Sequence, residues 1–167
     1  KIKQRRISGE VCRMARTIDL ILGSDHRGRD LKYEISDWLG GDYESGSLFD
    51  IATMWDCGTH KSSSCDYPDV VKEFSKHFDI YTHGILVCGS GYGVSIAANR
   101  FSYLRANVCR TVQEVQAGRQ HNNMNVLCIG ADFTSFSQAQ KLISTFIKTK
   151  FEGGRHLRRV KKLGNIT

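Results

Sequence analysis

The sequence predicts a single doubly wound α/β domain of three layers, in which helices cover both faces of a parallel sheet of about five strands. Three observations support this fold class. Short apolar segments alternate along the chain with segments in which apolar residues recur at helical spacing. The 167 residues, 40% of them apolar, are enough to bury one core without disulfides or a metal. The 16 glycines and the single proline form no low-complexity tract and mark no internal linker.

The strand candidates are short and mostly apolar, which is typical of strands buried on both faces of a parallel sheet. The third of them, GILVC, runs directly into a glycine-rich loop, and the second is the weakest candidate. In chain order they lie at 18–23, 51–57, 84–88, 106–109 and 125–130.

Helices are expected between these strands. After the first strand, apolar residues at positions 31, 35, 38 and 39 share one face of a helix that ends at Gly40-Gly41. Further helices are expected at 66–78, at 94–99, from about 111, and at 139–147. Strands that alternate with helices imply right-handed crossovers and therefore a Rossmann-like arrangement.

Basic residues gather at the two ends of the chain. Residues 1–16 contain six Lys or Arg and one Glu, so they carry +5 of the formal net charge of +7. A second basic cluster occupies 155–162. A nucleic-acid-binding face would not be confined in this way, and no apolar run reaches the roughly 18 residues of a membrane helix. We expect a solvated basic extension at 1–16, a domain at 17–163, and neither nucleic acid nor membrane as a partner.

The six cysteines contain no CxxC pair and no spacing typical of zinc ligands. A core-rich chain of this size needs no disulfides, so reduced thiols in a cytoplasmic protein are the simplest interpretation. Cys109 and Cys128 lie in apolar strand candidates, where a free cysteine packs as a small hydrophobe. Cys88 differs from them because of its neighbours.

Three polar groups of residues adjoin the strand candidates, namely Gly23–His26, Cys88–Gly93 and His121-Asn122. In a sheet of this kind ligands bind beyond the carboxyl ends of the strands. We therefore expect all three groups at that edge of the sheet.

The glycine loop at 88–93 can bring backbone N–H groups close to an anion at the start of the following helix. Dinucleotide-binding loops share this spacing, but they follow the first strand and precede an acidic residue by about 20 positions, and neither condition holds here. The loop begins with Cys88, and a helix N-terminus favours the thiolate of a cysteine, which can then act as a base. The alternative is a buried cysteine at a strand end that only packs in the core.

Several motifs occur in the order in which one enzyme family has them. They are Gly-Ser-Asp-His at 23–26, Asp-Tyr-Pro at 66–68, Cys-Gly-Ser-Gly-x-Gly-x-Ser-Ile-Ala-Ala-Asn at 88–99, Arg-Gln-His-Asn at 119–122, Asn-Val-Leu at 125–127 and Glu-Gly-Gly-Arg-His-x-x-Arg at 152–159. With them the sequence resembles ribose-5-phosphate isomerase type B, in the sugar-phosphate isomerase family that also includes galactose-6-phosphate isomerase subunits. The resemblance covers about residues 18–163.

The resemblance implies interconversion of ribose 5-phosphate and ribulose 5-phosphate through an enediolate, without metal or organic cofactor. It implies that Cys88 is the base at carbon, that Ser90 and the loop amides stabilise the enediolate, and that His121 opens the furanose ring. Asp25 matches a residue that contacts the sugar. The positions that match substrate-binding residues are His26, Gly89, Gly91, Tyr92, Gly93, Asn122, Arg155 and Arg159.

Each of these residues, taken alone, also has an ordinary structural explanation. Asp25 would cap the following helix, and His121 would be an exposed histidine at a helix end. Arg155 and Arg159, four residues apart, would form a solvated helical face. Their combination in one chain favours the enzyme.

The sequence departs from the family at two site positions. Ser90 stands where Thr is common, which keeps the hydroxyl. Asp132 stands where the family has an Arg that helps to bind phosphate. We therefore expect Asp132 either to repel the phosphate or to turn away and pair with a neighbouring cation such as Arg110 or Arg158.

The family forms homodimers, and some members form tetramers, with active sites shared across the interface. We therefore expect a homodimer or a tetramer in which His121 and Asn122 serve a site whose Cys88 belongs to the other subunit. Two alternatives stay open at this point. One is an isomerase of a hexose 6-phosphate, such as allose or galactose 6-phosphate, and the other is a non-catalytic sugar-phosphate-binding protein.

Overall fold

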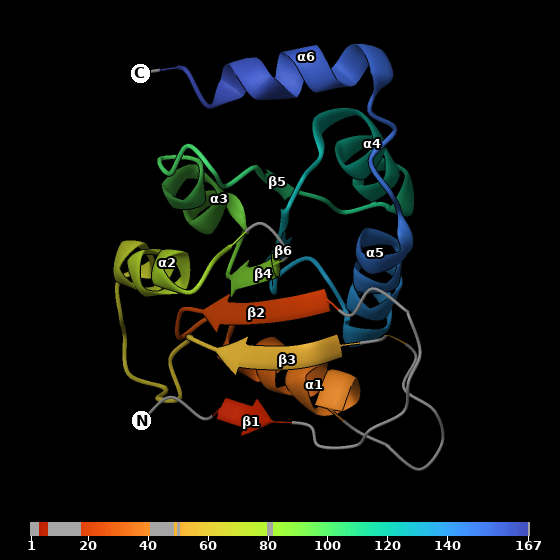
Figure 1. Ribbon diagram of the computed structural model, residues 1–167. Coiled ribbons are helices and arrows are strands. Elements are labelled where there is room, and N and C mark those ends of the chain that lie inside the picture. Colours follow the sequence, from red (N-terminus) through yellow and green to blue (C-terminus); the bar gives the residue numbers. More distant parts are fainter. Residues whose placement is uncertain (1–3, 7–17, 41–48, 50, 80–81, 167) are drawn as a thin grey trace.

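The computed structural model describes residues 4–6, 18–40, 49, 51–79 and 82–166. Its strands are β1 (Gln4–Arg6), β2 (Ile18–Ser24), β3 (Ile51–Asp56), β4 (Thr82–Cys88), β5 (Ala106–Val108) and β6 (Val126–Gly130). They form one sheet in the order β1-β3-β2-β4-β6-β5, with β1 antiparallel to β3 and the other neighbours parallel (Figure 1). The predicted doubly wound sheet of five parallel strands is confirmed, and β1 adds an edge strand to it.

Helices cover both faces of this sheet, as predicted (Figure 1). The helices are α1 (Arg29–Gly40), α2 (Tyr67–Lys76), α3 (Tyr92–Ala98), α4 (Val112–Asn122), α5 (Phe136–Lys148) and α6 (Gly154–Leu163). The core on one face involves α1, α4 and α5, and the core on the other face involves α2 and α3. Helix α6 lies outside these layers beside α4 and has no buried residue.

Successive side chains of the central strands face opposite helical layers because the side-chain period of a strand is two. In β2, Leu20 and Leu22 pack in the core on the α1–α4–α5 face, and Ile21 packs on the α2–α3 face. In β4, Ile85 and Leu86 repeat this alternation. All five side chains are fully buried. Burial of each contributes roughly 1.5–3 kcal/mol to the hydrophobic driving force.

The direction of the chain sets the two edges of the sheet. The five parallel strands end at one edge, here called the carboxyl edge, and helices α1 to α5 carry the chain back to the opposite, amino edge.

Helix α4 begins with a reciprocal cap at the carboxyl edge. The hydroxyl of Thr111 accepts a hydrogen bond from the N–H of Glu114 over 3.2 Å, and the Glu114 carboxylate accepts one from the N–H of Thr111 over 3.0 Å. This reciprocal cap starts α4 directly after β5.

Two elements lie outside the predicted pattern. Strand β1 comes from the basic segment 1–16, of which only Gln4–Arg6 is described, so this part of the segment pairs with the sheet. The expected solvated extension otherwise concerns residues 1–3 and 7–16, which lie outside the described ranges. Helix α6 carries the second basic cluster. Among the described helices, none combines the length and the apolar character needed to cross a membrane.

Candidate active site

The carboxyl edge brings together the polar residues that follow β2 and β4. The N–H of Asp25 donates a hydrogen bond to the carbonyl of Val87 over 3.3 Å, which joins the ends of the two strands. The group Gly23–His26 and the loop 88–93 are therefore neighbours, as predicted from their positions after apolar strands. This edge is the place where a ligand binds in a doubly wound sheet.

Cys88, the last residue of β4, has its sulfur held by the loop that follows. The N–H of Gly91 donates a hydrogen bond to Sγ over 3.1 Å, and such a donor stabilises a thiolate. Gly91 has a φ of 82°, a left-handed conformation that glycine adopts without strain. The Cys88 side chain is only 5% exposed and packs with Val94 and Ala98. The thiol therefore packs as a core residue does, while its sulfur accepts a hydrogen bond that packing does not require.

Ser90 follows Cys88 by two positions in the same loop. Its Oγ accepts a hydrogen bond from the N–H of Tyr92 over 3.4 Å, which leaves the hydroxyl proton to be donated to a ligand. The N–H of Ala131, which follows β6, donates to the carbonyl of Cys88 over 2.8 Å and fixes the start of the loop. The loop thus carries a hydroxyl donor close to Cys88 on a backbone that neighbouring segments hold in place.

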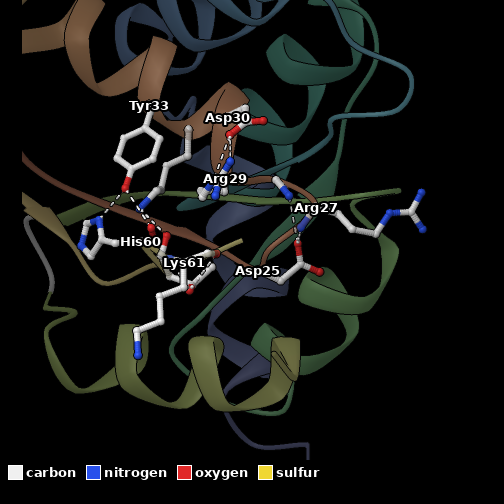
Figure 2. A network of polar contacts seen from close by, with 10 residues as sticks. Asp25, Arg27, Arg29, Asp30, Tyr33, His60 and Lys61 are labelled. Carbon is white, nitrogen blue, oxygen red and sulfur yellow. Dashed lines mark hydrogen bonds and ion pairs between the residues drawn. The ribbon is translucent and has the colours of Figure 1, made fainter. Parts of the chain in front are cut away.

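Asp25 organises the turn between β2 and α1 (Figure 2). Its Oδ1 accepts hydrogen bonds from the N–H of Arg27 over 2.9 Å and from the N–H of Gly28 over 3.0 Å. The structural role expected for Asp25, capping of the following helix, therefore accounts for the hydrogen bonds of Oδ1. Among the described residues none donates to Oδ2, so this oxygen can accept a sugar hydroxyl.

His26 and Tyr67 border the same edge. The Nδ1 of His26 accepts a hydrogen bond from the N–H of Cys65 over 3.3 Å, which assigns the ring proton to Nε2 in the neutral form. His26 can therefore donate to a ligand from Nε2. The Tyr67 ring lies against Gly93, where an added Cβ would be 3.0 Å from ring carbons. This contact holds the start of α2 against the start of α3.

The expectation that His121 and Asn122 lie at the carboxyl edge is wrong. Helix α4 starts after the carboxyl end of β5 and ends at Asn122, just before β6 begins at Val126. A residue that directly precedes a parallel strand lies at the amino edge. Asn122 there lines a cavity of about 460 Å³ together with Asn99 and Leu163. Within one chain, His121 and Asn122 are therefore separated from Cys88 by the length of the sheet.

His121 instead contacts the start of α6. Its ring stacks on that of His156, with centroids 4.6 Å apart and planes 15° apart. The N–H of Glu152 donates to the carbonyl of Gln120 over 3.1 Å, which holds the segment before α6 against the end of α4. Partial desolvation and the neighbouring His121 and Arg155 lower the pKa of His156 below its ordinary value. The structure therefore groups His121 with α6, which also carries the predicted Arg155 and Arg159.

His121, Glu152 and His156 are also the group of described residues whose ligand atoms lie close enough for a metal, all within 4.8 Å of one another. Their surroundings disfavour a cation. The Nε of Arg155 donates to Nε2 of His156 over 3.4 Å, and α6 is strongly basic. The Nε2 lone pair of His156 that a metal would use is therefore already engaged by a cationic side chain.

Asp132 pairs with a residue that the sequence did not indicate. Its Oδ2 lies 2.5 Å from Nη2 of Arg27, so Asp132 pairs with a cation as expected, but that cation is neither Arg110 nor Arg158. Arg110 instead donates to the hydroxyl of Tyr92 over 2.6 Å. Arg27 directly follows the motif at 23–26, but the residue type alone does not reveal a contact with a residue 105 positions away.

Comparison with known proteins identifies the family. A family model described as Ribose/Galactose Isomerase matches residues 20–163. The chain belongs to this family. It is 36% identical over 149 residues to ribose-5-phosphate isomerase B of Escherichia coli, an alignment that covers 88% of this chain and 95% of that protein. The resemblance read from the motifs is confirmed.

Solved structures of the family share the fold. Ribose 5-phosphate isomerase B from Anaplasma phagocytophilum aligns with a TM-score of 0.79 and 37% identity, covering 88% of this chain and 97% of that one. The Mycoplasma genitalium ribose-5-phosphate isomerase B with bound ribulose-5-phosphate aligns with a TM-score of 0.75 and 35% identity, covering 89% and 95%. At these identities the likeness extends to the family as well as to the fold.

Proposed function

We propose that this member of the ribose/galactose isomerase family is an isomerase that interconverts ribose 5-phosphate and ribulose 5-phosphate. The observation that carries the proposal is the sulfur of Cys88, which accepts a 3.1 Å hydrogen bond from the N–H of Gly91 at the carboxyl edge. The family relative with bound ribulose-5-phosphate supports a pentose phosphate as substrate. The free thiols of Cys57, Cys65, Cys109 and Cys128 are consistent with a reducing, cytoplasmic location.

The residues of the carboxyl edge suit the proton transfers of this reaction. The Cys88 thiolate removes the proton from C2 of the open-chain aldose, and the electron pair moves onto the C1 oxygen to give the enediolate. Ser90 donates to the developing oxyanion, and the loop amides add further donors. Cys88 then returns the proton to C1, and the proton of the C2 hydroxyl passes to the C1 oxygen, which gives the ketose and regenerates the thiolate. A positioned general base contributes roughly 10²- to 10⁴-fold in rate.

Ring opening calls for a second subunit. His121 matches the acid that opens the furanose, yet it lies at the amino edge of its own chain. Large apolar side chains are exposed on α3 and α6, where Ile96 is 67% and Leu157 is 44% exposed. A helix such as α6, without buried residues of its own, gains stability by covering such a surface on a second copy. We therefore propose a homodimer in which His121, Asn122, Arg155 and Arg159 of one subunit complete the site of the other.

The activity is tested by mixing the purified chain with ribose 5-phosphate, allose 6-phosphate and galactose 6-phosphate and measuring ketose formation. We expect turnover of ribose 5-phosphate, a loss of roughly 10²- to 10⁴-fold in Cys88→Ala, and near wild-type turnover in the control Cys57→Ala. Turnover of a hexose phosphate alone would contradict the pentose assignment. Near wild-type turnover by Cys88→Ala would contradict its role as the base.

The shared site is tested by mixing two inactive variants, Cys88→Ala and His121→Ala, after dissociation and reassociation. In a mixed dimer, one site combines the intact Cys88 of one subunit with the intact His121 of the other. Half of the dimers are mixed and half of their sites are intact, so about a quarter of wild-type activity should return. If both residues of a site came from one chain, no activity would return.

A further inference from the structure

The ion pair between Arg27 and Asp132 joins two loops of the carboxyl edge. Nη2 of Arg27 lies 2.5 Å from Oδ2 of Asp132. Arg27 lies between β2 and α1, and Asp132 follows β6 by two positions. Strand β4 lies between β2 and β6 in the sheet, so the loops after the two outer strands meet over the loop that follows β4.

The pair lies directly over the residue that follows Cys88. A Cβ added to Gly89 would be 2.7 Å from Nε of Arg27 and 3.1 Å from Oδ2 of Asp132, so a larger residue at 89 would displace the guanidinium from this position. The N–H of Asp132 also donates to the carbonyl of Gly89 over 3.0 Å. The guanidinium is thus held against the backbone of the loop that carries the proposed base.

Arg27 retains unused donors. Its side chain is 60% exposed, and Asp132 accepts from Nη2 alone, which leaves Nε and Nη1 without an acceptor among the described residues. Arg110, the other guanidinium near this loop, is engaged with the Tyr92 hydroxyl and stacks on the Phe133 ring. Arg27 is set apart by its place against Gly89, directly beside Cys88, where an anion bound to it would adjoin the loop.

Resting on the proposed function, we propose that Arg27 binds the phosphate of the substrate and that Asp132 is the positioning residue that holds its guanidinium over Gly89. The free N–H groups on Nε and Nη1 can each donate a charge-assisted hydrogen bond to a phosphate oxygen, and such bonds are stronger than neutral ones. Asp132 does not repel the phosphate as a lone carboxylate would, because the charge of Arg27 offsets it.

The test compares KM and kcat for ribose 5-phosphate, and the inhibition constant of inorganic phosphate, in Arg27→Ala and Arg27→Ala/Asp132→Ala. We expect Arg27→Ala to raise KM and the inhibition constant about tenfold or more, with kcat within about threefold of wild type. The double variant should recover part of this loss, because it also removes the exposed carboxylate. The effect should shrink at high salt.

Arg29→Ala is the matched control. It removes the same charge two residues along the chain, but the Arg29 side chain turns to Asp30, with Nη2 2.7 Å from Oδ1, and points away from that of Arg27 (Figure 2). Its KM should stay close to that of wild type. An equal rise in both variants would show a general charge effect and overturn the assignment of Arg27.

The failures of the two proposals can be told apart. A wild-type protein without ribose 5-phosphate turnover refutes the proposed function. A wild type that turns over ribose 5-phosphate, together with an Arg27→Ala variant of unchanged KM and unchanged phosphate inhibition, refutes the role of Arg27. Asp132→Asn should raise KM with Arg27 still present, because the guanidinium loses the carboxylate that holds it; an unchanged KM in that variant refutes the role of Asp132. A fall in kcat and melting temperature without a change in KM would show that the pair is only structural.

Discussion

Asp56→Asn removes the charge partner of a fully buried ammonium. The side chain of Lys32, from α1, is 0% exposed, and its Nζ lies 2.6 Å and 2.8 Å from the two carboxylate oxygens of Asp56 at the end of β3. The N–H of Gly58 donates to the same carboxylate over 3.0 Å, and asparagine can still accept that bond. The substitution therefore changes the charge while keeping the size and the backbone contact.

Removal of one partner from a buried ion pair costs roughly 3–5 kcal/mol of folding free energy. The cost of deprotonating the unpaired lysine sets an upper limit on this loss of folding free energy, and the limit has a similar size. A lysine ammonium left unpaired can release its proton, which for an ordinary lysine pKa of about 10.4 costs about 4.6 kcal/mol at pH 7. At pH 9 the same release costs only about 1.9 kcal/mol. The folded variant then binds fewer protons than the unfolded chain, so its stability rises with pH relative to wild type.

Urea unfolding followed by circular dichroism measures the free energy of unfolding of wild type and of Asp56→Asn at pH 7 and at pH 9. We expect a loss of about 3–5 kcal/mol at pH 7 and no more than about 2 kcal/mol at pH 9. Lys32→Met/Asp56→Asn should be more stable than Asp56→Asn at pH 7, because it leaves no buried charge. Glu73→Gln, which removes an acid from an exposed pair with Lys76, should unfold close to wild type. A loss in Asp56→Asn that is small, or equal at both pH values, would refute the reasoning.

Two further predictions concern the Cys88 loop. Iodoacetamide should inactivate the protein by modifying Cys88, and ribose 5-phosphate should protect against this inactivation. Cys109 should stay unmodified because burial raises its pKa to about 12. Peptide mass spectrometry identifies the modified cysteine, and modification of Cys109 before activity is lost would contradict the prediction. Gly91→Ala, at a φ of 82°, should cost about 1–2 kcal/mol in urea unfolding and also lower kcat, because the amide moves from Sγ. Gly153→Ala has a comparable φ of 68° but no atom within 4 Å of an added Cβ, so it should cost less stability than Gly91→Ala and leave kcat unchanged. Equal effects of the two substitutions on kcat would contradict a special role of the Gly91 amide.

The fold class and one half of the candidate site were predictable from residue order alone. Alternating apolar segments predict β2, β4 and β6, because burial on both faces requires them to be apolar throughout. Residues that directly follow such strands lie at the carboxyl edge whatever the order of the strands. Because Asp25 and Cys88 adjoin the ends of such strands, the sequence alone predicted both at the carboxyl edge. The motifs predicted the family, which the comparisons confirm.

Contacts between side chains that are distant in the sequence depend on the three-dimensional path of the chain. His121 belongs to the amino edge because α4 returns the chain there before β6, so its distance from Cys88 follows from the path of the backbone. Arg27 and Asp132 are 105 residues apart and pair because β4 lies between β2 and β6. Periodicity reports which face of an element is buried, but strand order is set by the crossovers and by packing between elements. Contacts that depend on strand order therefore leave no local pattern in the sequence.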